Sequence, residues 1–219
     1  MLPLARFLRK NGYDTINILY PSRKKSLEDL ADFVHDKIQK HLNSQSHSPS
    51  EQALGTPSEG EGRRLHFVNH SMGGLITRYY IQKYKPKNLG KVIMLSPPNT
   101  GSEFADALMN NKALSAPYKF FFGPAGAQLS TSYKHTDKIT YPLGVIAGNK
   151  SINPLALWAL PRKKVGPHDG IVPVARTKID GMTDHITMPV NHTFMMFKRP
   201  VMQQVLHFLK TEKFKHKLT

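Results

Sequence analysis

The residues of this chain whose types and order could perform chemistry are a serine, an aspartate and a histidine. Ser71 lies in the stretch LHFVNHSMGGLI, residues 65 to 76, where an apolar run turns at the serine, passes two glycines and continues in a helical pattern. That pattern is typical of a nucleophile elbow, a tight strand-to-helix turn that exposes a serine hydroxyl above a sheet. A serine hydroxyl is a weak nucleophile, so it needs a base within reach and backbone N–H groups for the oxyanion that forms.

The motif departs from the usual G-x-S-x-G pattern at its first position. Asn69 stands where the first glycine is expected, whereas Gly73 occupies the last position. Small residues flank such a serine because the strand and the helix pass close together. A serine followed by glycines also occurs in ordinary strand-to-helix turns, so the rest of the chain must decide between the two interpretations.

The acid and base candidates follow Ser71 in loops that leave predicted strands. Asp169 lies in a loop after the strand at 143 to 147, and His192 lies just after the strand at 185 to 190. The carboxyl ends of parallel strands meet at one edge of a sheet, where ligands usually bind. We therefore predict that Ser71 is the nucleophile, His192 the base and Asp169 the carboxylate that orients it. Taken singly, such an aspartate or histidine is more often solvated or caps a local turn.

Five other titratable residues are weaker candidates. Asp184 and His185 are predicted at the start of a strand, at the opposite end of the sheet from Ser71. Asp180 lies late in a connecting loop. His70 is inside the elbow and is predicted to face away from the base position and to pack, while His168 is predicted to cover Asp169.

The elements that must position these residues alternate between helix and strand. Apolar spacing, caps, prolines and glycines predict helices at 2–11, 26–42, from Ser71 to near Pro86, around 103–109 and from about Val201, and strands at 15–20, 65–70, 91–96, 141–148 and 185–190. This order predicts an α/β fold with a mostly parallel sheet covered by helices on both faces. A length of 219 residues is consistent with a single domain over residues 1–219.

Two segments interrupt this alternation. Residues 43–63 are rich in Ser, Gly, Pro and Glu and predict a flexible surface loop. Residues 102–140 contain the aromatic group Tyr118, Phe120, Phe121 and Phe122. Such a group usually belongs to a core. The alternative is a cap or lid that lines an apolar substrate pocket.

The composition is strongly basic and contains no cysteine. Lys and Arg number 31 and Asp and Glu 15, which gives a formal charge of +16. Such a surface attracts anionic lipid, nucleic acid or acidic substrates. The basic clusters, which include Arg162-Lys163-Lys164, are scattered and match no nucleic-acid-binding fold, so a solvated surface or an anionic membrane surface is favoured and no nucleic acid is expected.

No apolar run is long enough for a membrane helix, and the first residues do not form a signal peptide, so the chain reads as cytoplasmic if Met1 is the native start.

Together, NHSMGGLITRYY, SPPNTGSE, HDGIVPV and NHTFMM resemble the small bacterial lipase and esterase-like α/β hydrolases over most of the chain. The resemblance implies hydrolysis of carboxylic esters, small or lipidic, through an acyl-enzyme, with Ser71, Asp169 and His192 in the roles given above. It also implies that the backbone N–H of Met72 donates to the oxyanion. No metal or organic cofactor is implied. Acyl transfer or thioester cleavage would use the same residues.

The resemblance also implies a part that residues 1–219 do not contain. In the family, a central strand and an HG-type loop upstream of the first helix supply a second oxyanion donor, and the strand lies between those matching 15–20 and 65–70. We expect either that Met1 is internal to a longer protein, which would leave membrane association or export open, or that this is a truncated form with a rearranged sheet. Two alternatives to an active esterase follow: a catalytically impaired hydrolase-like module, and a basic membrane-surface binding protein. Neither substrate identity nor oligomeric state is predicted.

Overall fold

The computed structural model describes residues 1–45, 63–133 and 137–216. Its helices are α1 (Leu2–Arg9), α2 (Leu27–Gln45), α3 (Met72–Tyr84), α4 (Glu103–Asn110), α5 (Ser115–Ala127), α6 (Leu155–Ala159), α7 (Arg162–Val165), α8 (Val174–Thr177) and α9 (Arg199–Thr211), with a 3-10 turn η2 (Met195–Phe197). Its strands are β1 (Leu65–His70), β2 (Leu89–Leu95), β3 (Leu143–Gly148) and β4 (Asp184–Met188). Most of the loop predicted at 43–63 lies outside the described residues, and α2 extends into its first three positions.

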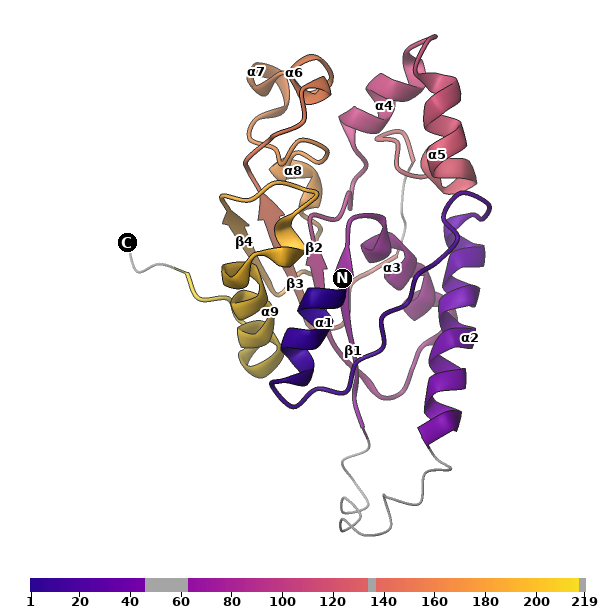
Figure 1. The fold of residues 1–219 in the computed structure, drawn as a ribbon, viewed down its shortest axis with the longest axis vertical. Coiled ribbons are helices and arrows are strands. Elements are labelled where there is room, and N and C mark those ends of the chain that lie inside the picture. The colour runs from indigo at the N-terminus through magenta and orange to yellow at the C-terminus, as the bar shows by residue number, and fades with distance from the viewer. Residues whose placement is uncertain (46–62, 134–136, 217–219) are drawn as a thin grey trace.

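The four strands form one parallel sheet in the order β1-β2-β3-β4. Figure 1 shows α1 and α9 on one face of this sheet and α2 and α3 on the other. A parallel neighbour requires a crossover connection, and α3 supplies it between β1 and β2. The predicted α/β architecture with a parallel sheet and two covered faces is confirmed.

Alternation along β2 shows how the strands serve two cores. Val92 and Met94 pack in the cluster formed with α2 and α3, whereas Ile93 and Leu95 pack in the cluster formed with α1 and α9. All four side chains are fully buried. Successive strand residues point to opposite faces, so a continuous apolar run is what a strand between two helical layers requires.

The prediction of a strand at 15–20 is wrong. No regular element forms there: Ile16 and Ile18 pack partly buried against the α2 and α3 side of the core, while Leu19 is 82% exposed. A strand needs a hydrogen-bonded neighbour. The apolar residues of this segment therefore indicate partial burial at Ile16 and Ile18, but neither the burial of Leu19 nor a strand pairing is found.

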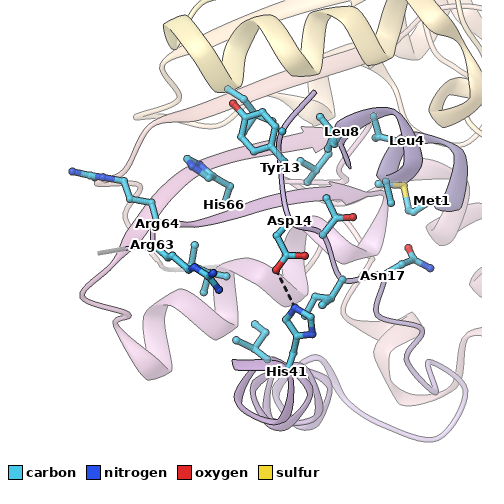
Figure 2. A pocket seen from close by; sticks show the side chains of 18 of the residues that line it. Met1, Leu4, Leu8, Tyr13, Asp14, Asn17, His41, Arg63, Arg64 and His66 are labelled. Carbon is cyan, nitrogen blue, oxygen red and sulfur yellow. Dashed lines mark hydrogen bonds and ion pairs between the residues drawn. The ribbon is translucent and has the colours of Figure 1, made fainter. Parts of the chain in front are cut away.

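A groove lies between this segment and the free edge of β1 (Figure 2). Its volume is about 550 Å³, and apolar side chains of α1, including Leu4 and Leu8, form part of its wall. His66 and Val68 line it from β1, and Asp14, which bonds His41 at 3.4 Å, lines it from the opposite side. Residues 13–17 form the wall of the groove opposite β1. Because the groove separates them from the edge of β1, they do not pair with that strand.

The free edge of β1 predicts an alternating pattern of amide hydrogen exchange. The N–H groups of Leu65 and Ser71 bond to residues next to and within β2, and parallel pairing places Phe67 and Asn69 on the same side. His66 and Val68 therefore direct their N–H groups into the groove. We expect their amides to exchange faster than those of Phe67 and Asn69 in native-state hydrogen exchange followed by NMR. Equal protection of both pairs would show that the outer edge is already paired.

Helices α4 to α7 stand at the end of the sheet where the strands finish (Figure 1). Ser102 caps α4 by accepting the Phe104 N–H at 3.2 Å, and α4 packs against α6.

Of the aromatic group predicted as core, Tyr118 is buried but Phe120 is 69% exposed, because both lie on α5 and face different sides of that helix. The side chain of Phe121 lies outside the described part of the chain. Within the described ranges, no helix is both long and apolar enough to span a membrane.

Candidate active site

Ser71 lies on a strained turn between β1 and α3. Its backbone has φ 55° and ψ −129°, a conformation that residues with a side chain rarely adopt. Its N–H donates to the Leu95 carbonyl at 2.9 Å, and its carbonyl accepts the Gly74 N–H at 3.0 Å. Strain of this kind persists where the surrounding structure holds it and concentrates at functional sites. The geometry is that of the predicted elbow.

The elbow accommodates Asn69 at the position where a glycine is expected. A Cβ added at Gly73 would lie 3.6 Å from Asn69 Cβ and 3.4 Å from the Tyr20 hydroxyl. A Cβ at Gly74 would lie only 3.0 Å from Met94 Sδ and 3.1 Å from Pro97 Cβ. The close approach of α3 to the sheet is therefore tight at Gly74, whereas a Cβ at Gly73 would make only ordinary van der Waals contacts, including one with Asn69.

The three residues predicted from the sequence meet above the carboxyl ends of the strands. His192 Nε2 lies 2.9 Å from Ser71 Oγ, and His192 Nδ1 lies 2.7 Å from Asp169 Oδ2. His192 follows β4, and its N–H donates to the Asp169 carbonyl at 3.1 Å. Residues separated by about a hundred positions are thus joined in the chain Ser–His–Asp that acyl-transfer chemistry uses.

Buried hydrogen bonds fix the charge and orientation of Asp169. Its Oδ1 accepts the N–H groups of Ile171 at 2.9 Å and Val172 at 2.8 Å. Burial alone would raise the pKa of Asp169, but the charge of His192 and hydrogen bonds from His192, Val172 and Ser96 outweigh it and hold the pKa below its ordinary value. An ionised carboxylate only accepts, so His192 Nδ1 carries the proton and Nε2 presents its lone pair to Ser71.

Ser96 supports the acid and was not identified from the sequence. It ends β2 with a positive φ of 44°, is fully buried, and accepts the Gly148 N–H at 3.2 Å while its hydroxyl donates to Asp169. A Cβ on Gly148 would lie 2.5 Å from the Val190 carbonyl and 2.8 Å from Asp169 Cβ. The signal that could have revealed Ser96 is its position: a polar residue directly after the buried apolar run Val92–Leu95, at the edge where ligands bind.

His70 packs against His192 and bonds to its main chain. The rings of His70 and His192 are 4.6 Å apart, and His70 Nε2 donates to the His192 carbonyl at 2.9 Å. Burial, followed by the charge of His192, lowers the pKa of His70 to about 3. The ring is therefore neutral at physiological pH and acts as a fixed hydrogen-bond donor. The predicted packing role is confirmed, but the prediction that His70 faces away from the base position is wrong, because its ring lies against His192 and bonds to the His192 carbonyl. That bond adds a positioning role.

Replacing His70 with phenylalanine tests that positioning role. The ring contact is kept, but the His192 carbonyl loses its donor, so we expect kcat for a reaction at Ser71 to fall up to about tenfold, in line with the net value of one hydrogen bond. His70→Gln, which keeps a donor, should restore part of kcat. Steady-state kinetics and thermal unfolding of both variants provide the measurement. A parallel loss of kcat and of folding stability in both variants would reduce His70 to packing alone.

The competing titratable residues are engaged elsewhere. Asp184 begins β4 and accepts the Phe214 N–H at 2.7 Å, and His185 Nε2 lies 3.0 Å from Thr177 Oγ1. His168 is buried and its Nδ1 accepts the Gly170 N–H at 3.1 Å, which shapes the turn that carries the acid. Asp180 is exposed. None of the contacts described for these residues reaches Ser71.

No protein-family model matches the chain, and its sequence matches no curated protein. Similar folds are found among solved structures. A lipase of Bacillus licheniformis, BlEst2 in mature form, superposes with a TM-score of 0.72 at 20% identity over 94% of this chain and 83% of the lipase. Phospholipase PlaB of Legionella pneumophila gives a TM-score of 0.66 at 16% identity over 96% of this chain and 56% of PlaB.

A metagenomic carboxyl esterase, MGS0156, gives a TM-score of 0.65 at 15% identity over 88% of this chain and 58% of the esterase. The chain therefore spans little more than half the length of two of these three proteins. At sequence identities this low, a structural match shows similarity of fold only. The reaction has to be inferred from the residues of the site. With its parallel sheet, its strand-to-helix turn at Ser71 and these structural neighbours, the chain has the α/β-hydrolase fold.

Proposed function

We propose that this protein is a serine hydrolase that cleaves carboxylic esters through an acyl-enzyme. The observation that carries the proposal is the continuous hydrogen-bonded series from Ser71 Oγ through His192 to a buried Asp169. The positive φ of Ser71 supports it, because the strained turn directs the hydroxyl to His192. The descriptions of the structural neighbours as lipase, phospholipase and carboxyl esterase support carboxylic esters as the substrate class.

In this mechanism Ser71 Oγ attacks the ester carbonyl carbon while His192 Nε2 takes the hydroxyl proton. The oxyanion that forms accepts a hydrogen bond from the Met72 N–H, which has no partner within α3 because Met72 is the first residue of that helix. The alcohol leaves with the proton from His192. Water then attacks the acyl-enzyme, His192 accepts its proton, and the carboxylic acid is released as Ser71 regains its hydrogen. Asp169 stabilises the imidazolium in both halves.

Residues 102–140 are proposed as the cap that shapes the acyl pocket. Helices α4 and α5 follow the carboxyl end of β2, beside the elbow, and α4 packs against α6 on the side of the acid loop.

Hydrolysis of p-nitrophenyl esters of increasing acyl length tests the proposed function, with the Ser71→Ala variant as the background. Turnover that depends on Ser71 supports it, and a length optimum would describe the pocket. Turnover by the Ser71→Ala variant equal to that of the parent chain would contradict it.

One observation favours a second candidate, a hydrolase-like module with impaired catalysis. The Met72 N–H is the one oxyanion donor that the proposal names, and removal of one such donor typically lowers kcat by about 10²–10³. Slow turnover with full labelling of Ser71 by a fluorophosphonate would support this candidate. Rapid turnover would exclude it.

A further inference from the structure

The segment between β3 and the acid carries a surface with its own chemistry. We call residues 149–167, which include α6 and α7, the α6–α7 loop. It contains four cations, Lys150, Arg162, Lys163 and Lys164, and no aspartate or glutamate. All four are exposed, and no salt bridge within the described ranges engages any of them. The loop therefore presents uncompensated positive charge to solvent.

The same loop exposes large apolar side chains. Ile152 is 64% exposed, Leu155 48% and Trp158 54%, whereas Ala156 and Ala159 are buried. Among the α6 side chains that the structure describes, the two alanines thus face inward, and Leu155 and Trp158 face outward. That is the reverse of the arrangement expected for a helix on a protein surface that meets only water. An exposed apolar group of this kind marks a contact with a partner.

We propose that the α6–α7 loop docks on an anionic lipid surface. Trp158, Leu155 and Ile152 would enter the region between headgroups and acyl chains, where a tryptophan ring is favoured. The cations of the loop would contact the phosphate groups, each stabilising the bound state through the negative surface potential. A nucleic acid would use the cations but would leave the two aliphatic side chains without a partner.

The position of the loop connects docking with the candidate active site. The loop leaves the carboxyl end of β3 and leads directly into His168 and Asp169 (Figure 1). Docking would therefore bring the end of the molecule that carries Ser71 to the lipid. Hydrolysis of lipid esters at that surface rests on the proposed function, but binding of the loop does not.

The chain contains a single tryptophan, so its fluorescence reports on this loop alone. The probe is a set of vesicles of phosphatidylcholine, with and without phosphatidylglycerol, mixed with the Ser71→Ala variant so that no vesicle lipid is hydrolysed. We expect sedimentation with the anionic vesicles only, weaker binding at high salt, and a blue shift of Trp158 emission. Lipids brominated along the acyl chain should quench that emission.

Two sets of variants separate this loop from the general charge of the protein. Arg162→Gln, Lys163→Gln and Lys164→Gln together should weaken binding on the order of a hundredfold, because each cation near an anionic surface contributes about a factor of five. The matched control, Lys40→Gln, Lys87→Gln and Lys210→Gln, removes the same charge from exposed positions outside the loop, in the last turns of α2 and α9 and just before β2. It should weaken binding less than tenfold. Ile152→Ser with Leu155→Ser keeps the charge and the reporter, and should reduce both binding and the blue shift.

Three results would overturn the proposal. The first is binding to anionic vesicles without any change in Trp158 emission, which would place the contact on another face. The second is an equal loss of binding in the two triple variants, which would make the effect a property of net charge. The third is no vesicle binding at all, including the case in which a single-stranded oligonucleotide binds through Arg162, Lys163 and Lys164. In each case ester hydrolysis by the parent chain is still measured separately in solution, so the two proposals fail independently.

Discussion

Replacement of Ser71 with alanine is expected to lower kcat for ester hydrolysis by about 10⁴-fold or more. The variant loses the only oxygen that His192 Nε2 contacts in the described structure, at 2.9 Å, and with it the acyl-enzyme route. Substrate binding should change little, because the removed atom is small and acts on the carbonyl carbon during reaction. The measurement is steady-state hydrolysis of the best p-nitrophenyl ester, with kcat and KM determined separately.

The matched control is Ser44→Ala, which removes an exposed hydroxyl that donates to the His41 carbonyl at 2.8 Å near the end of α2. Its kcat should equal that of the parent chain. Thermal unfolding of both variants distinguishes a loss of chemistry from a loss of folding. A Ser71→Ala variant that folds and retains a tenth or more of the parent kcat would show that another group attacks the ester.

Asp169→Asn is expected to lower kcat by about 10⁴-fold while the fold persists. An asparagine amide can donate to His192 Nδ1, which would favour the tautomer with the proton on Nε2 and remove the lone pair that faces Ser71. The imidazolium formed during reaction would also lose its anionic partner. The low pKa of Asp169 places the parent carboxylate in its charged form across the pH range in which histidine chemistry operates, so this loss should be visible at every such pH.

The control for this prediction is Asp180→Asn, which makes the same chemical change at an exposed aspartate late in the following loop. It should leave the pH profile of kcat unchanged. The result that contradicts the role of Asp169 is an Asp169→Asn variant with kcat within tenfold of the parent value. In that case His192 would be oriented by the N–H bond to the Asp169 carbonyl and by His70 alone.

The sequence predicted the parts of the site that depend on chain order and on strand ends. Ser71 was recognisable because two glycines follow it where strand and helix meet, and the structure shows tight contacts at Gly74. Asp169 and His192 were recognisable because each follows an apolar strand, and parallel strands bring such positions to one edge. Local pattern and topology therefore sufficed to place three distant residues together.

The remainder depends on contacts that no local pattern contains. The alternation at 15–20 indicates burial, but pairing requires a neighbour at the right distance, and a groove lies there instead. Phe120 has an apolar side chain yet faces solvent, because the position of α5 on the rest of the molecule decides which of its faces is covered. Ser96 and His70 act through bonds to Asp169 and His192 that depend on the assembled fold. Each of these is a tertiary effect.

The measurement that tests the central claim most directly is the intact mass of the chain after treatment with a fluorophosphonate, with circular dichroism to establish folding. The reagent reacts with an activated serine whatever its natural substrate, so it tests the relay from Asp169 through His192 to Ser71 without a choice of ester. The account predicts one adduct on the parent chain and none on the Ser71→Ala variant. A folded parent chain without an adduct, or an adduct that persists in the Ser71→Ala variant, would contradict it.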